Sequence, residues 1–375
     1  MASLFIAAPA FAAKINLRNN WSIQSSKEVK VSGNILSTAS WKPERWYPAT
    51  VPSTVFGTLV ENKVYPDPYF GTNILNVPGY ISRRGGEIPD DSPFKSSWWY
   101  RTTFTLPADF KGHNTWIKFH SINYKANIWL NGNLVADTTT IEGAYRLYNF
   151  NITRFAQPGK ENCLAVEIFP PKGTDLTITW VDWNPTPPDR GMGIWYDITV
   201  QSSGPVSIQN PHVITKLNLP STDKAKITVS AEVVNSSDKK VLGVLTGKIE
   251  NITFSQEITL APNESKNVTF DPEKYNQLTV SNPRLWWPHT VGPQNLYDLQ
   301  LSFNIKGKPS DVRDLRFGIR EISAWMNNFD KKHTKVFQIN GKNIVIKGGG
   351  YVEDMMLRPS DERIDADIAY AKHMG

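Results

Sequence analysis

The feature that most constrains the fold of this chain is a long series of short β-strand patterns separated by turn residues. The patterns are rich in Val, Ile, Thr, Tyr, Phe and Trp, and Pro, Gly and Asn stand between them, which is typical of antiparallel strands. We expect strands at residues 98–106, 115–120, 126–130 and 163–169. Since no long segment with a 3.6-residue period interrupts them, residues 13–203 are predicted to form an antiparallel β-sandwich.

The pattern changes after Gly204-Pro205. Shorter strand patterns with regularly spaced turns follow, and they are expected at residues 227–234, 242–250, 255–260, 266–270 and 297–305. This spacing predicts a second, smaller β-sandwich of immunoglobulin-like size over residues 204–322.

Residues 323–375 carry a different pattern. Asn340-Gly341 predicts a hairpin within residues 336–346, because both residues tolerate the positive φ angles of a two-residue turn. The hairpin leads into Gly348-Gly349-Gly350, and Ser360 followed by two acidic residues predicts the start of a helix. The apolar face of that helix is expected to contain Ile364, Ile368, Ala371 and Met374. A strand, a loop and a helix in this order indicate the first unit of an incomplete (β/α)8 barrel.

Composition excludes several classes of protein. The chain is 40% hydrophobic and 20% charged, which suits packed domains rather than disorder. Its net charge is +6, but the basic residues are scattered, so no nucleic-acid partner is expected. Cys163 is the only cysteine, and the histidines form no metal-ligand pattern, so neither a metal nor another cofactor is expected.

The first residues resemble part of a secretory signal. Residues 4–8 are apolar, and Ala10-Phe11-Ala12 has the small-x-small pattern of a cleavage site. We interpret residues 1–12 as the remnant of a signal peptide and expect an exported protein, periplasmic or extracellular; a frayed apolar terminus is the alternative. No segment contains 18 consecutive apolar residues, so no membrane partner is expected.

Several short motifs, taken in order, resemble those of family 2 glycoside hydrolases. They are Tyr65-Pro66-Asp67-Pro68-Tyr69, Ile128-Trp129-Leu130-Asn131-Gly132, Leu285-Trp286-Trp287-Pro288 and Gly318-Ile319-Arg320. Two further stretches, residues 182–195 and 348–358, resemble exo-β-D-glucosaminidases and are also similar to endo-β-mannosidases and β-mannosidases. The resemblance implies a jelly-roll sandwich, an immunoglobulin-like sandwich and a TIM-barrel catalytic domain that begins near residue 323.

The resemblance also implies a retaining hydrolase of oligosaccharides that uses two carboxylates. In the family both carboxylates lie on later barrel strands, so we expect no catalytic residue in this chain, and the rest of the barrel is an implied partner. Asn263-Glu264 and Asp361-Glu362 imitate the family's acid/base motif. We interpret the first pair as part of a turn and the second as part of a helix cap.

Four residues are candidates for substrate binding. By resemblance, Asp182 and Trp183 lie on a loop that reaches the barrel mouth, where an acid binds hydroxyl or amine groups and an indole stacks on a sugar ring. Tyr351 and Asp354 follow the first barrel strand, and the Asp354 carboxylate is a candidate partner for the ammonium group of glucosamine. The alternatives are structural: the two tryptophans Trp183 and Trp195 fix a Pro-rich loop, and Asp354 stabilises its own loop.

Trp195 is expected to pack rather than to bind substrate, and Asp189 and Arg190 are expected to form a local ion pair. The predicted function is that of an exo-β-D-glucosaminidase acting on chitosan oligosaccharides. The alternatives are a β-mannosidase or endo-β-mannosidase, and a non-catalytic carbohydrate-binding sandwich.

Overall fold

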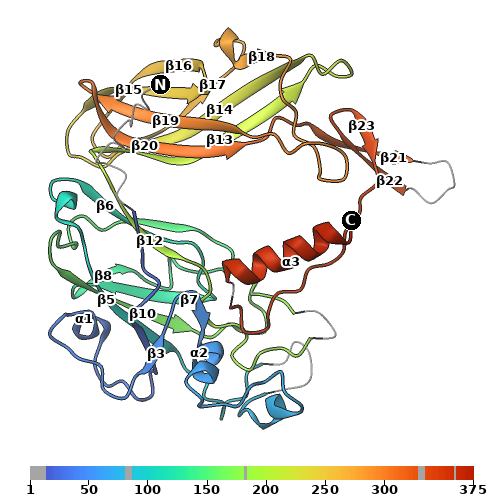
Figure 1. Ribbon diagram of the computed structural model, residues 1–375. Helices are drawn as coiled ribbons and strands as arrows, with labels where there is room; N and C mark the ends of the chain where they lie inside the picture. The colour runs from blue at the N-terminus through green and yellow to red at the C-terminus, as the bar shows by residue number, and fades with distance from the viewer. Residues whose placement is uncertain (1–13, 81–86, 181–183, 328–333, 359) are drawn as a thin grey trace, which may run out of the picture. The chain divides into compact units, whose positions relative to one another are not determined.

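The computed structural model describes residues 14–80, 87–180, 184–327, 334–358 and 360–375 (Figure 1). Strands contain 43% of the residues and helices 10%, so the predicted mostly-β class is confirmed. The described residues form two compact units. One contains residues 13–202 with residues 351–364, and the other contains residues 203–350 with residues 365–375.

The first unit is a sandwich of a six-stranded and a four-stranded sheet. The strand orders are β3-β2-β5-β10-β7-β8 and β1-β12-β6-β9, and β4 and β11 form a separate pair. The strands are β1 (Lys14–Asn16), β2 (Trp21–Ser25), β3 (Tyr47–Ala49), β4 (Ser53–Thr54), β5 (Trp98–Thr105), β6 (Asn114–Phe119), β7 (Lys125–Leu130), β8 (Asn133–Ala136), β9 (Tyr148–Asn151), β10 (Glu161–Phe169), β11 (Gly193–Ile194) and β12 (Ile198–Ser203).

One core fills this sandwich, and β10 shows how the sequence builds it. Leu164, Val166 and Ile168 point into the space between the two sheets and are fully buried. Cys163 and Ala165 alternate with them and are also buried, because α1 (Gly33–Leu36) covers the other face of the sheet. The sequence of a strand that is covered on both faces is a continuous apolar run, whereas a strand covered on one face alternates apolar and polar residues.

The second unit contains the smaller sandwich. Its sheets have the orders β13-β14-β17, with β18 beside β14, and β16-β15-β19-β20. Their inward-facing side chains, among them Phe270 and Phe303, form a separate core. The strands are β13 (Val206–Leu217), β14 (Lys224–Asn235), β15 (Val241–Ile249), β16 (Ile252–Leu260), β17 (Ser265–Phe270), β18 (Thr279–Ser281), β19 (Tyr297–Ile305) and β20 (Lys308–Phe317).

The last elements are an antiparallel sheet and a helix. The sheet contains β21 (Ile322–Asn327), β22 (Thr334–Ile339) and β23 (Lys342–Ile344), and the helix is α3 (Asp361–His373). Residues 345–360 between them form no strand or helix where they are described. The described strands within residues 334–358 pair only antiparallel, so the expected start of a barrel stays a prediction.

The local turn signals of the sequence are confirmed. Asn131 and Gly132 have φ angles of 50° and 85°, and Asn340 and Gly341 have 51° and 77°. The Ser360 hydroxyl accepts a hydrogen bond from the Arg363 amide (3.1 Å) at the start of α3. The apolar face expected on α3 is not covered: Ile364, Ile368 and Met374 are 39%, 61% and 76% exposed.

Short helices were not expected from the sequence. They are α1, α2 (Val55–Glu61) and the 3-10 turns η1 (Asn73–Asn76), η2 (Ala108–Phe110) and η3 (Asn276–Leu278). Of these, α2 matters for the site, because its N-terminus lies beside the segment that follows the last sheet. None of the helices in the described ranges is both long and apolar enough to cross a membrane.

Candidate functional site

Residues 351–358 lie against the first sandwich, although they follow the last sheet in the chain. Met355, Met356 and Leu357 are only 1–2% exposed. The two methionines join the main core of the sandwich, and Leu357 packs in a smaller cluster with Trp195. We call residues 351–358 the docking segment. Its apolar centre anchors it, and its polar residues lie at the surface around that anchor.

The Asp354 carboxylate organises the docking segment. Its Oδ1 accepts hydrogen bonds from the Met356 amide (2.7 Å) and from the Tyr69 hydroxyl (2.5 Å). Its Oδ2 is 3.4 Å from a guanidinium nitrogen of Arg358. Oδ1 is therefore committed to holding the loop, whereas Oδ2 has one long contact on a side chain that is 36% exposed.

Tyr69 is a partner that the sequence did not reveal. It lies in the segment after α2, where its amide donates a hydrogen bond to the Asp67 carboxylate (3.0 Å). Partial burial, followed by the hydrogen bond to Asp354, raises the pKa of the Tyr69 phenol far above its usual value. The phenol therefore stays protonated and acts as a hydrogen-bond donor to Asp354 at every physiological pH.

Beneath the docking segment, Asp189 joins two parts of the first sandwich. Its carboxylate is fully buried and accepts hydrogen bonds from the Phe56 amide (2.7 Å) at the N-terminus of α2 and from the Gly191 amide (2.9 Å). Desolvation raises the pKa of Asp189 to about 6, against the opposing effect of these hydrogen bonds. A carboxylate near a helix N-terminus also benefits from the partial positive charge there.

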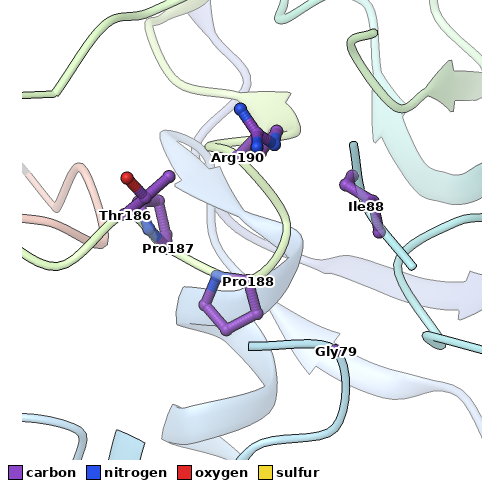
Figure 2. A pocket seen from close by; sticks show the side chains of 6 residues that line it. All are labelled: Gly79, Ile88, Thr186, Pro187, Pro188 and Arg190. Atoms are coloured by element: carbon purple, nitrogen blue, oxygen red, sulfur yellow. The ribbon is translucent and has the colours of Figure 1, made fainter. Parts of the chain in front are cut away.

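The expected ion pair between Asp189 and Arg190 is wrong. Both residues lie in a described range, and the Asp189 carboxylate is turned toward backbone amides instead. Arg190 has a φ angle of 53°, and its side chain lines a small surface hollow (Figure 2). The other lining residues are Gly79, Ile88, Thr186, Pro187 and Pro188.

The structure describes two of the four predicted substrate residues. Asp182 and Trp183 lie outside the described residues, so their role stays a prediction. Tyr351 is 65% exposed at the start of the docking segment, and Asp354 has the contacts given above. The prediction that Trp195 packs is confirmed, because it is 5% exposed and its indole N–H donates to the Ala144 carbonyl (3.0 Å).

The two motifs that imitate an acid/base pair are both structural. Asn263 adopts a φ angle of 54° in the turn between β16 and β17. The Glu264 carboxylate accepts a hydrogen bond from the Ala261 amide (2.6 Å) and so closes that turn. Asp361 and Glu362 lie in the first turn of α3, where they complement the helix dipole.

Comparison with known proteins assigns the class. The family model described as "Glycosyl hydrolase 2 galactose-binding domain-like" matches residues 21–177, and the one described as "Glycosyl hydrolases family 2" matches residues 206–320. The first match lies within the first sandwich, and the second covers most of the smaller one. The chain belongs to glycoside hydrolase family 2.

Individual members of this family also resemble the chain. The chain is 34% identical to an exo-β-D-glucosaminidase of Amycolatopsis orientalis over 94% of its own length, and 33% identical to one of Streptomyces avermitilis over 95%. It is 28% identical to a mannosylglycoprotein endo-β-mannosidase of Lilium longiflorum over 96%. The chain spans 32% to 39% of the length of these relatives.

Solved structures resemble the chain as well. The crystal structure of the Amycolatopsis orientalis exo-chitosanase CsxA matches with a TM-score of 0.84 and 34% identity, over 96% of this chain and 39% of that one. A Bacteroides uniformis β-glucuronidase matches with a TM-score of 0.70 and 18% identity, over 97% of this chain and 38% of that one. The second likeness shows the shared fold alone.

Proposed function

We propose that this chain supplies the amino-terminal domains of an exo-β-D-glucosaminidase that acts on chitosan oligosaccharides. The observation that carries the proposal is the match to exo-β-D-glucosaminidases over nearly the whole chain, at 34% identity in sequence and a TM-score of 0.84 in structure. The proposed reaction is retaining hydrolysis, in which one carboxylate attacks the anomeric carbon and a second protonates the leaving oxygen.

Both reacting carboxylates are placed outside residues 1–375 in this proposal. The exposed apolar face of α3, with Ile368 at 61% exposed, supports a further layer of barrel that covers it. Export of the protein is part of the same proposal and rests on the pattern of residues 1–12.

The contribution of this chain to the site is substrate contact. We assign that role to Asp182, Trp183, Tyr351 and Asp354. For Asp354 the supporting observation is the division of its carboxylate. Oδ1 is held by Tyr69 and the Met356 amide, and among the described residues Oδ2 has only the long contact with Arg358. An oxygen held in place but not saturated suits a charge-assisted hydrogen bond to the glucosamine ammonium.

The test begins with the gene. Its reading frame around the codons for residues 1–375 is expected to encode the remaining barrel, with two glutamates at strand ends. The encoded protein is then assayed on 4-nitrophenyl β-D-glucosaminide and β-D-mannoside. Faster cleavage of the mannoside would replace the proposal by its alternative, which the similarity to the lily endo-β-mannosidase favours.

A pair of variants tests the role of Asp354 in that protein. Asp354→Asn keeps the size of the side chain and removes its charge, so glucosaminide cleavage should fall roughly tenfold to a hundredfold, because hydrogen bonds to charged groups contribute about 1.5–3 kcal/mol. Glu353→Gln changes the charge of an exposed neighbour and should have little effect. Equal losses on glucosaminide and mannoside in Asp354→Asn would reduce its role to holding the docking segment.

A further inference from the structure

The hollow around Arg190 has the features of an anion site. The Arg190 side chain is partly buried, and desolvation lowers the pKa of its guanidinium. No side chain among the described residues forms an ion pair or hydrogen bond with it. Figure 2 shows Arg190 between Thr186 and Pro187 on one side and Ile88 on the other.

Two neighbouring acids in the described ranges, Asp189 and Glu87, have other partners. Asp189 is turned into the core toward the amides of Phe56 and Gly191. Glu87 favours the charged form of Arg190 from a distance, but its carboxylate accepts from the Gly173 amide (2.8 Å) and lies near the Lys95 ammonium (3.9 Å). Among the described residues, the guanidinium therefore loses water and gains only the distant charge of Glu87, which is costly unless a ligand compensates.

The backbone holds Arg190 rigidly for such a ligand. Its amide donates to the Pro187 carbonyl (2.9 Å), and its carbonyl accepts from the Asn123 side-chain amide (3.0 Å). Pro187 and Pro188 are buried and have fixed φ angles. The turn is therefore preorganised, and only the outer part of the arginine side chain is free to adjust.

We propose that the hollow binds a carboxylate group through the Arg190 guanidinium. The planar fork of one guanidinium matches the two oxygens of a carboxylate, and a single cation does not balance a phosphate dianion. The walls formed by Ile88, Pro187 and Pro188 are apolar, and the hollow is small, so it suits the carboxylate end of a ligand rather than the whole molecule. The carboxylate belongs either to an acidic side chain outside residues 1–375 or to a free small acid.

The experiment observes the Nε–Hε resonance of Arg190 in the 375-residue chain during titration with acetate. We expect a saturable shift with a Kd on the order of 10 mM for one bidentate pair. Acetamide, which has the same shape and no charge, should cause no shift at matched ionic strength. Arg18, whose guanidinium already pairs with Asp197 (3.1 and 3.2 Å), is the internal control.

Three variants test whether the response to acetate arises at Arg190. Arg190→Gln should abolish the response, Arg190→Lys should weaken it about tenfold because the fork is lost, and Arg154→Gln, at an exposed arginine of the same sandwich, should leave it intact. An equal response to chloride or phosphate, or a response that persists in Arg190→Gln, would overturn the proposal. Repeating the titration on the full-length gene product separates the two sources: loss of acetate binding there assigns an internal side chain, and retained binding assigns a free acid.

Discussion

Replacing Asp189 by Asn tests the electrostatics beneath the docking segment. The folded state raises the pKa of this carboxyl from 3.8 to about 6, so the folded protein favours the protonated form. The stability that this group contributes is fully present below pH 4 and is lost as the pH rises through 6. A shift of about 2 units corresponds to roughly 3 kcal/mol, at 1.36 kcal/mol per unit.

Asparagine has the same shape but does not titrate. Its single acceptor oxygen can serve only one of the two amides of Phe56 and Gly191. The other amide loses its acceptor, at a cost of about 1–3 kcal/mol. We therefore expect Asp189→Asn to be less stable than the wild type at pH 4. Between pH 4 and pH 7.5, the free energy of unfolding of the variant relative to that of the wild type should rise by about 3 kcal/mol.

The assay is urea unfolding between pH 4 and pH 7.5, followed by hydrogen exchange in peptides that contain α2. Subtracting wild type from variant cancels other groups that titrate in this range, including Asp311, which lies in the second unit and has a pKa of about 6. Asp90→Asn is the control, because the Asp90 side chain is 96% exposed. A difference between Asp189→Asn and wild type that stays constant with pH would refute the reasoning.

Three further predictions concern the docking segment. Leu357→Ala should destabilise the first unit by about 2–5 kcal/mol, because it leaves a cavity beside Trp195. Gly191→Ala should lower the free energy of unfolding by about 1–2 kcal/mol, since the φ angle of Gly191 is 70° and a Cβ would lie 3.2 Å from Leu357 Cδ1. The double variant should lose less stability than the sum of the two single variants. Urea unfolding of the three variants would show this. Tyr69→Phe should speed proteolysis within residues 351–358, because Asp354 loses a hydrogen bond; an unchanged rate would contradict the role given to Tyr69.

The sequence predicted those parts of the fold that depend on neighbouring residues. Asn131-Gly132 and Asn340-Gly341 specify their turns through backbone angles alone, and Ser360 begins α3 through a local hydrogen bond. By contrast, α2 carries a mid-helix glycine, Gly57, and β-branched residues, which have low helix propensity. It exists because tertiary contacts bury it, and a single sequence does not show such contacts.

The site was less predictable for the same reason. The sequence indicated Asp354 but not Tyr69, its hydrogen-bond donor, which lies 285 positions earlier in the chain. Only the folded sandwich brings the two together. The burial of Met355, Met356 and Leu357 is likewise a property of the surface that receives them, because three consecutive apolar residues in a loop show no period that would indicate a partner.

The adjacent charges of Asp189 and Arg190 show why a sequence pattern and its physical outcome differ. An ion pair was expected from their proximity, but a half-buried pair would leave the amides of Phe56 and Gly191 without acceptors. Buried backbone amides require a partner, and the Asp189 carboxylate satisfies both of them. The positive φ angle of Arg190 then lets the chain turn while its side chain lines the hollow. The fold thus uses the acid for its own backbone, and no side chain in the described part of the chain pairs with the neighbouring cation, which is the physical reason to propose a ligand at Arg190.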